Sequence, residues 1–276
     1  MGAYLRPHCL DEALTALARP HVVLAGGTDF YPARVGRAIG EDVLDIGGIA
    51  ILRGISAHSA GWRLGATTTW SELIEAHLPP LFDGLKQAAR EVGGRQIQNA
   101  GTLAGNLCNA SPAADGVPCL LALDAEIEIA SPTGNRRLPL SQFITGVRRT
   151  ALAPGELVVA VHVPQPRHEA RSAFLKLGTR RYLVISIAMA AATVEVADGR
   201  IASARIAVGA CSPVAARLPR LEAALEGAPL DGRLAERVEA AHLAPLSPID
   251  DVRGSAAYRS DAVVTVLRRL LRGFVS

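Results

Sequence analysis

The sequence predicts a mixed α+β fold, with two N-terminal subdomains over residues 1–56 and 57–165 and a C-terminal domain over residues 170–276. Segments with strand and helix periodicity alternate through the first two parts. In the third part, the dipeptide Asp198-Gly199 between two apolar runs is a strong hairpin signal and predicts an antiparallel sheet. Helical spacing of alanine and leucine after Arg217 predicts helices packed on that sheet. A chain of 276 residues is long enough for two or three units with their own cores.

The first subdomain is predicted to hold one helix and two short strands. Apolar residues recur with helical spacing over Cys9–Ala18. His21–Ala25 is a short apolar strand that runs directly into a glycine loop, and Val43–Ile46 is a second strand. The turn at Gly47–Gly48 leads into a helix-like or extended segment through Ile55, which closes the subdomain.

The second subdomain is predicted to combine short strands with helices. Trp62–Ala66 alternates as a strand does, and the threonines of TTTWSEL offer an N-cap for a helix to about His77, broken by Pro79–Pro80. The other predicted elements are an amphipathic helix, a short helix and two strands, over Leu81–Val92, Asp115–Leu123, Glu126–Ala130 and Leu157–Val163.

The C-terminal domain follows a polar, proline-containing stretch, Pro164–Arg171, which we interpret as a linker. Its predicted strands form an antiparallel meander over Phe174–Leu177, Ile185–Val196 and Ile201–Ala210. The helical pattern from Arg217 is interrupted at Pro229 and at Pro245–Pro248, and it ends in one long helix, Ala256–Leu271.

Composition argues against several classes of function. The chain has 29 Lys and Arg against 26 Asp and Glu, a formal charge of +3, which is too balanced to favour nucleic-acid binding. No apolar run reaches the roughly 18 residues that a membrane-spanning helix needs. The acidic pair Asp11–Glu12 lies where a signal peptide would have its apolar core, so we expect a cytoplasmic protein.

The four cysteines, Cys9, Cys108, Cys119 and Cys211, form no C-x-x-C pair and have no histidine at the spacing of a metal ligand. We therefore expect neither a metal site nor an iron–sulfur cluster on this chain, and free thiols rather than disulfides. None of the seven histidines lies in the two glycine-rich stretches described next. No residue is indicated as a catalytic acid, base or nucleophile.

Two glycine-rich stretches are the most informative feature of the sequence. Ala25–Asp29 reads AGGTD and Asn99–Asp115 reads NAGTLAGNLCNASPAAD. Their glycines can reach positive φ and let main-chain N–H groups approach an anion, as we expect for Gly26, Gly27, Gly101 and Gly105. Short polar side chains between them can orient a polar ligand without filling its space: Thr28, Thr102, Asn106 and Asn109.

Each stretch by itself is equally consistent with a tight turn. Neither contains G-x-G-x-x-G, and no G-x-x-x-x-G-K-[ST] run occurs in the chain. A Rossmann domain or a P-loop is therefore not expected.

In order, spacing and detail, the two stretches resemble those of the flavin-binding medium subunit of the molybdenum hydroxylases, the family that includes xanthine dehydrogenase and carbon monoxide dehydrogenase. Later segments in matching order extend the resemblance over nearly the whole chain: LLALDAEIEIAS at Leu120–Ser131, FITGVRRTALAPGELVVAVHVP at Phe143–Pro164, FLKLGTRRYLVISIAMAAA at Phe174–Ala192, and two stretches near Cys211 and Asp251. The resemblance implies an α+β fold in which a two-subdomain flavin-binding domain of the PCMH type precedes a C-terminal domain with an antiparallel sheet and packed helices.

The resemblance also implies FAD as the cofactor. It places main-chain donors of the first stretch and polar groups of the second against the pyrophosphate, and Leu157 and Val158 near the adenine. Asp115 would accept a hydrogen bond from a ribose or ribityl hydroxyl, and Lys176 would lie beside the flavin, where positive charge favours the reduced form. The cofactor-binding positions implied in this way are Leu24, Ala25, Gly26, Gly27, Thr28, Asp29, Ile97, Gly101, Thr102, Gly105, Asn106, Cys108, Asn109, Asp115, Leu157, Val158, Lys176 and Ile185.

Ile185 departs from the family pattern. Some relatives place a tyrosine a few residues after the paired arginines, whereas this chain has Ile185 there and its tyrosine earlier, at Tyr182. How the isoalloxazine is shielded is thus left open. So is the terminal acceptor, whether NAD, oxygen or another carrier.

The resemblance further implies an oxidoreductase subunit that works within a complex. Electrons from a substrate hydroxylated at the molybdenum cofactor of a large subunit would pass through [2Fe-2S] clusters of a small subunit to FAD on this chain, and the assembly would be a dimer of heterotrimers. The substrate stays open, because its pocket would lie on another chain.

Two alternatives to this function are a self-sufficient flavin oxidoreductase and a cofactor-free assembly subunit. The lack of an evident acid or base near the glycine-rich stretches weighs against the first alternative. The intact pattern of small and amide residues weighs against the second.

Overall fold

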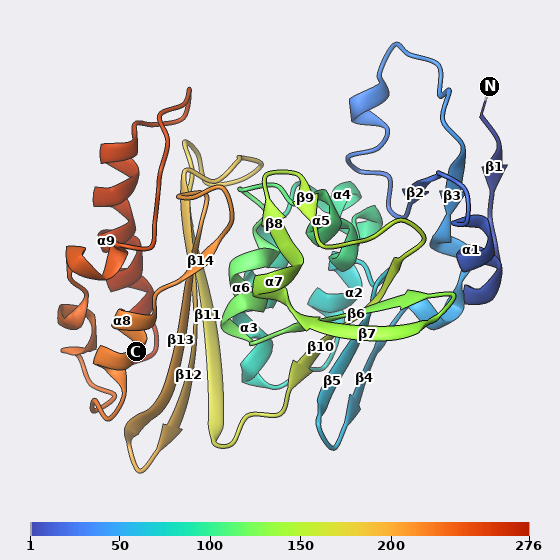
Figure 1. Ribbon diagram of the computed structural model, residues 1–276. Helices are drawn as coiled ribbons and strands as arrows, with labels where there is room; N and C mark the ends of the chain where they lie inside the picture. The colour runs from blue at the N-terminus through green and yellow to red at the C-terminus, as the bar shows by residue number, and fades with distance from the viewer. Residues whose placement is uncertain (1, 276) are drawn as a thin grey trace.

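The computed structural model describes residues 2–275 and arranges them in three bodies side by side (Figure 1). A small lobe with a three-stranded sheet contains the N-terminus, and a five-stranded sheet with several short helices forms the centre. A four-stranded sheet follows, with the C-terminal helices on its outer side. This is the α+β architecture expected from the sequence, with an antiparallel sheet and packed helices at the C-terminal end.

The N-terminal lobe contains strands β1 (Tyr4–Leu5), β2 (Val22–Leu24) and β3 (Val43–Asp45) and helix α1 (Leu10–Ala16). Both outer strands pair in parallel with β3, in the order β1-β3-β2. The predicted helix and the two predicted strands are confirmed, with shorter bounds. The lobe packs its apolar residues against one face of the central sheet, so its position relative to that sheet is fixed by a shared core.

The central sheet is antiparallel, in the order β4-β5-β10-β6-β7. Its strands are β4 (Ile55–His58), β5 (Gly61–Gly65), β6 (Glu126–Ser131), β7 (Gly134–Pro139) and β10 (Leu157–Pro164). The middle strand, β10, is buried along its length except at Pro164. Val158 and Val161 face the central helices, while Leu157 and Val159 face the N-terminal lobe, so β10 is the element that both bodies share.

Short helices cover the face of the central sheet that points away from the lobe. They are α2 (Trp70–Glu75), α3 (Asp83–Glu91), α4 (Arg95–Ala100), α5 (Leu103–Asn109), α6 (Gly116–Ala122) and α7 (Leu140–Phe143), and a small hairpin of β8 (Ile144–Gly146) and β9 (Arg149–Thr150) follows them. The predicted N-cap of α2 is confirmed: the Thr69 side chain accepts a hydrogen bond from the Glu72 N–H, and the Glu72 carboxylate accepts one from the Thr69 N–H.

The second glycine-rich stretch is largely helical. The sequence favours a loop between Asn99 and Asp115, but α4 extends to Ala100 and α5 covers Leu103–Asn109, with Gly101–Thr102 and residues 110–115 outside the helices. Thr102 is the N-cap of α5, and the alanine, leucine and asparagine residues that follow it continue the helix for seven residues. Small residues here serve close packing of helices rather than a flexible loop.

The C-terminal sheet is an antiparallel meander of β11 (Glu169–Leu177), β12 (Ala188–Ala197), β13 (Arg200–Gly209) and β14 (Ala216–Arg217). The hairpin predicted at Asp198–Gly199 is confirmed, since both residues have positive φ and join β12 to β13. The expected linker over Pro164–Arg171 was too long, because β10 continues to Pro164 and β11 begins at Glu169. The predicted strand Ile185–Val196 is confirmed, but its start was placed too early: Leu183 adopts a left-handed conformation, with φ +53°, and β12 starts only at Ala188.

Helices α8 (Pro219–Leu225) and α9 (Ala256–Arg272) pack on the outer face of this sheet. The long terminal helix is confirmed. The helical pattern expected between the breaks at Pro229 and Pro245–Pro248 is not confirmed as an α-helix, because that stretch forms only short 3₁₀ turns over Leu234–Arg237 and Ala240–Leu243. No helix between residues 2 and 275 is long and apolar enough to cross a lipid bilayer.

The inner face of the C-terminal sheet rests on the central helices through α3 and β11. The Ser172 hydroxyl donates to the carbonyl of Leu81 at 2.6 Å and accepts from the N–H of Gly84 at 2.8 Å. The Gln87 side chain accepts from the N–H of Phe174 at 2.8 Å. Buried hydrogen bonds between the two bodies fix their relative position, because breaking them would leave polar groups unpaired away from water.

The first turn of α9 is tied to the sheet by Arg259, whose residue surface is only 2% exposed. Its guanidinium donates to the carbonyls of Ile187 and Ala210 and pairs with Asp251 at 2.6 Å. Hydrogen bonds from the Arg253 N–H, and then from the Arg259 and Arg253 side chains, lower the pKa of Asp251 to about 2.

This arrangement predicts an acid-sensitive contribution of Asp251 to stability. An unfolded aspartate titrates near pH 4, so the stabilisation is complete above about pH 4 and is lost as the pH falls toward about 2. We expect Asp251→Asn to lower the melting temperature at neutral pH, and we expect the gap to the unmodified protein to shrink over that window. Thermal unfolding between pH 7 and pH 2 measures it.

The matched control is Asp261→Asn, on the exposed face of α9, where the part of the chain that the structure describes gives the carboxylate no ion pair. A gap for Asp251→Asn that stays constant from pH 7 to pH 2 would contradict the assignment.

Candidate functional site

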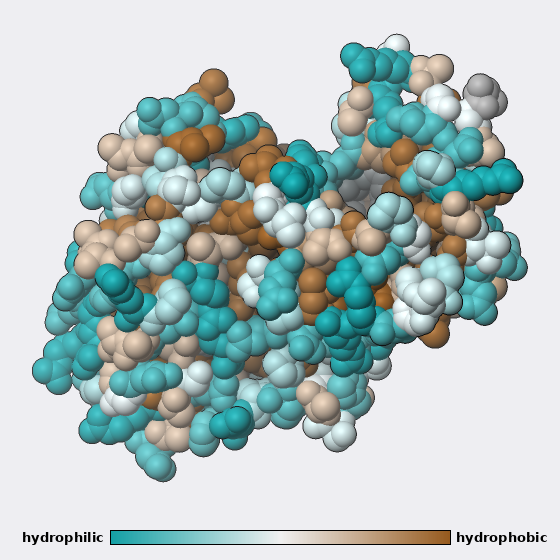
Figure 2. All heavy atoms as spheres, in the orientation of Figure 1, coloured by the Kyte–Doolittle hydropathy of each residue, from teal (hydrophilic) through white to brown (hydrophobic). Residues whose placement is uncertain are grey.

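A cavity of about 520 Å³ lies between the N-terminal lobe and the central body. Figure 2 shows it as a hollow beside the lobe at upper right. Its walls come from three places: residues 22–34, residues 97–109, and the start of β10. The volume is within the usual range for small-molecule and cofactor sites.

The first wall is the loop that follows β2, and it presents unused hydrogen-bond donors. Within residues 2–275, the backbone N–H groups of Gly26, Gly27, Thr28 and Asp29 make no hydrogen bond, and neither does the Thr28 hydroxyl. All four residues line the cavity. Consecutive N–H groups without a protein partner are the arrangement that binds an anion such as a phosphate group. These N–H groups therefore form a site that can bind the phosphate group of a ligand.

Close contact between the two glycine-rich stretches explains part of their composition. A Cβ atom on Gly26 would lie 1.8 Å from the carbonyl oxygen of Ala100, so no other residue fits there without displacement of the backbone. We expected positive φ at Gly26, Gly27, Gly101 and Gly105, but of these four only Gly27 has it, with φ +72°. The other three positions hold glycine because a Cβ atom there would lie too close to neighbouring atoms.

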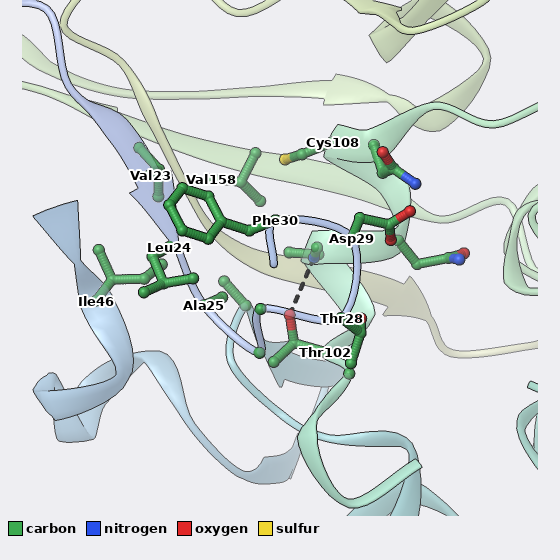
Figure 3. A pocket seen from close by; sticks show the side chains of 18 of the residues that line it. Val23, Leu24, Ala25, Thr28, Asp29, Phe30, Ile46, Thr102, Cys108 and Val158 are labelled. Atoms are coloured by element: carbon green, nitrogen blue, oxygen red, sulfur yellow. Dashed lines mark hydrogen bonds between the residues drawn. The ribbon is translucent and has the colours of Figure 1, made fainter. Parts of the chain in front are cut away.

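The second wall begins at the N-cap of α5. The Thr102 hydroxyl accepts a hydrogen bond from the Gly105 N–H at 3.1 Å, drawn as the dashed line in Figure 3, which leaves its own hydrogen free to donate. Asn106, one turn into α5, also lines the cavity, and its buried Oδ1 atom has no partner among the described residues. Buried amide oxygens almost always accept a hydrogen bond, so a ligand or a water molecule is expected to donate one to Asn106 Oδ1.

The third wall is apolar. Leu157 and Val158 at the start of β10 line the cavity, and the ring of Phe30 lies beside Leu24 and Val158 (Figure 3). A flat aromatic group would bury its faces against such a wall, while its polar parts would reach the donors of the other two walls. The cavity thus has the two kinds of surface that a dinucleotide needs.

Most of the positions named from the sequence meet at this cavity. Those that line it are Leu24, Ala25, Gly26, Gly27, Thr28, Asp29, Ile97, Gly101, Thr102, Gly105, Asn106, Cys108, Asn109, Leu157 and Val158. Asp115, Lys176 and Ile185 do not. Cofactor contact by any of these residues stays a prediction.

Asp115 and Lys176 form a buried pair with each other. Lys176 Nζ is 2.6 Å from Asp115 Oδ2, and the Ser186 hydroxyl donates to Asp115 Oδ1 at 2.7 Å. Burial raises the pKa of the Asp115 carboxyl, and Lys176 and Ser186 act in the opposite direction. Both carboxylate oxygens already accept hydrogen bonds from the chain, so in this structure Asp115 connects α6 to the C-terminal sheet. Ile185 is 53% exposed, in the connection between β11 and β12.

Several lining residues were not identified from the sequence, and Phe30 and Arg34 are the most informative of them. The Arg34 guanidinium lies 4.0 Å from the centre of the Phe30 ring, donates to the Phe30 carbonyl at 3.1 Å and pairs with Glu41 at 2.9 Å. Their spacing of four residues, with Pro32 between them at the start of a 3₁₀ turn, was the available signal. Trp70, Leu152 and Glu156 also line the cavity, and no comparable sequence pattern points to them.

The cysteines are all unpaired. Cys108 lines the cavity and is exposed, as is Cys9 at the N-cap of α1, whereas Cys119 and Cys211 are buried. Across residues 2–275, no group of three or more His, Cys, Asp or Glu side chains is arranged to hold a metal ion.

Known protein families match this chain over nearly its whole length. Residues 1–166 match the family described as the FAD binding domain in molybdopterin dehydrogenase, and residues 173–274 match the CO dehydrogenase flavoprotein C-terminal domain. The xanthine dehydrogenase FAD-binding subunit of Escherichia coli O157:H7 is 33% identical over 98% of this chain and 94% of its own length. The nicotinate dehydrogenase FAD-subunit of Eubacterium barkeri is 30% identical over 97% and 94%. The structure of the reconstituted CO dehydrogenase from Oligotropha carboxidovorans superposes with a TM-score of 0.89, at 28% identity over 98% of this chain and 96% of the matched chain.

The contact between Gly26 and Ala100 generates a prediction. We expect Gly26→Ala to force the two stretches apart, to lower the free energy of unfolding by roughly 1–3 kcal/mol as overpacking does, and to reduce the amount of flavin retained on purification. Urea unfolding and the flavin-to-protein absorbance ratio measure the two effects.

Gly40→Ala is the control, since Gly40 lies in the same lobe with open space around it and no positive φ. Equal stability and flavin content in both variants would contradict the packing role of Gly26.

Proposed function

The chain belongs to the family of FAD-binding medium subunits of the molybdenum hydroxylases, and we propose that it holds FAD in the cavity beside the N-terminal lobe. In this role it passes electrons from iron–sulfur clusters of a partner subunit to a terminal acceptor. The observation that carries the proposal is the run of four unbonded N–H groups from Gly26 to Asp29 at the cavity wall. A pyrophosphate supplies the acceptor oxygens that such a run requires.

The polar residues bind and orient the cofactor. The N–H groups of Gly26–Asp29 and the hydroxyls of Thr28 and Thr102 would donate to the pyrophosphate from opposite walls. The Oδ1 atom of Asn106 would accept a hydrogen bond from a cofactor hydroxyl or ring N–H, which would remove its unpaired state. FAD, when bound, supplies the transfer of one or two electrons, while the protein supplies position and electrostatics.

The apolar residues exclude water. Leu157 and Val158 would cover one face of the adenine, with Phe30 beside them. No acid, base or nucleophile is assigned, because electron transfer through a bound flavin needs none from this chain. Lys176 keeps its proposed place near the flavin ring, with Asp115 as its partner; Ile97 and Ile185 are proposed to flank the cofactor.

The names of the relatives support a proposal about the partner subunits of this chain. Named relatives are FAD subunits or medium chains of dehydrogenases and hydroxylases, which accords with a large molybdenum-cofactor subunit and a small [2Fe-2S] subunit here, in a dimer of heterotrimers. Four free cysteines accord with a cytoplasmic location. FAD would lie between the two N-terminal subdomains, residues 1–56 and 57–165. The C-terminal α+β domain would comprise residues 170–276.

The substrate is assigned to the partner chain. Relatives named for xanthine and for nicotinate share 33% and 30% identity with this chain, so the identities favour neither substrate clearly. We accordingly propose no substrate.

The direct experiment is the absorbance spectrum of the purified chain, followed by heat release and chromatography of the chromophore. We expect FAD at about one per chain, no iron or molybdenum, and no turnover of organic substrates by the chain alone. Full turnover by the isolated chain would instead establish a self-sufficient flavin oxidoreductase, and no uptake of added FAD would establish an assembly subunit.

The hydrogen bond that the Thr28 hydroxyl would donate to the FAD pyrophosphate can be tested separately. We expect Thr28→Val to weaken FAD binding about 10- to 100-fold, since a hydrogen bond to a charged group contributes about 1.5–3 kcal/mol. Quenching of flavin fluorescence on titration gives the dissociation constant. Thr133→Val, in the exposed turn between β6 and β7, should bind FAD like the unmodified chain; equal affinity of all three proteins would contradict the assignment.

A further inference from the structure

Arg148 lies in the turn between β8 and β9, at the rim of the flavin cavity. Its backbone N–H donates to the carbonyl of Ala110 at 2.9 Å, just after α5, and its φ is +57°. The turn is therefore anchored to the end of the second cavity wall, and the start of the Arg148 side chain is fixed relative to α5.

The guanidinium of Arg148 reaches both polar walls of the cavity. Its Nη1 atom donates to the Asn109 side chain and, at 3.2 Å, to the Asn109 carbonyl, and it lies 3.9 Å from Asp29 Oδ1. Asn109 and Asp29 both line the cavity, one at the end of α5 and the other at the end of the first glycine loop. Arg148 is thus a bridge across the two stretches that would enclose the cofactor.

The positive charge of Arg148 has a second effect, on the electrostatics of the cavity. The Asp29 carboxylate lies beside the N–H groups that would receive the pyrophosphate, and a negative charge there disfavours a phosphorylated ligand. The cation of Arg148 offsets that charge. Both side chains are more than half exposed, at 56% and 61%, so the pair contributes little to folding and is weakened by salt.

We propose that Arg148 is a latch that holds the two walls together over bound FAD and sets how fast the cofactor is released. This inference rests on the proposed function of the cavity. Because the bridge joins two exposed groups, its loss changes the opening of the cavity more than the stability of the fold. Arg148 acts through Asp29 and Asn109, and it is therefore a positioning residue.

The neighbouring arginine offers a matched control. Arg149 is exposed at the start of β9, and within residues 2–275 its side chain forms no hydrogen bond or ion pair. Arg148→Gln and Arg149→Gln remove the same charge from adjacent positions, and only the first removes the bridge. Arg148→Lys keeps the charge without the planar fork and should restore part of the effect.

The experiment measures FAD release from the full-length chain by the rise in flavin fluorescence after dilution, at low and at high salt. We expect Arg148→Gln to release FAD about fivefold faster at low salt, Arg149→Gln to match the unmodified chain, and Arg148→Lys to fall between. High salt should speed release from the unmodified chain and leave Arg148→Gln nearly unchanged. The thermal midpoint of the cofactor-free chain should be the same for all four proteins.

Equal release from Arg148→Gln and the unmodified chain, or equal acceleration by Arg149→Gln, would overturn the latch while leaving the proposed function in place. Failure of the unmodified chain to take up FAD would overturn the proposed function, and the latch with it.

Discussion

The structure depends on the contact between the first glycine loop and the turn between α4 and α5. Gly26 rests directly on the carbonyl of Ala100, and this contact brings two segments more than 70 residues apart in the sequence to the same cavity. Because the loop is pressed against α4 and α5 rather than against a strand, the N–H groups of residues 26–29 have no partner among residues 2–275. The same contact therefore closes the cavity and supplies its donors.

The rest of the fold fixes the two sides of this contact. The N-terminal lobe shares a core with β10, and α4 and α5 pack over the opposite face of the central sheet. The C-terminal sheet supports the central helices through Ser172, Gln87 and the pair of Lys176 with Asp115. Ser172 and the pair of Lys176 with Asp115 are buried, whereas Arg148 and Asp29 meet in solvent at the rim of the cavity.

Local signals predicted the elements whose formation depends on neighbours in sequence. The N-cap at Thr69, the strand that became β10 and the Asp198–Gly199 turn were all predicted from the sequence, and the structure confirms them. Helix α5 was missed because its small residues resemble those of a loop, and its helical state is set by the Thr102 cap and by packing. At the site, the glycine and threonine positions were accessible through their spacing and resemblance. Arg148 was not, because its contacts join segments that only the tertiary fold brings together.

Hydrogen–deuterium exchange on the full-length chain, with and without FAD, would test the central claim most directly. We predict that FAD slows exchange of the backbone amides of residues 26–29, which lack partners among the described residues, with a smaller effect at residues 102–109. Unchanged exchange at residues 26–29, together with new protection elsewhere in the chain, would show that the cofactor binds at another place and would contradict the account.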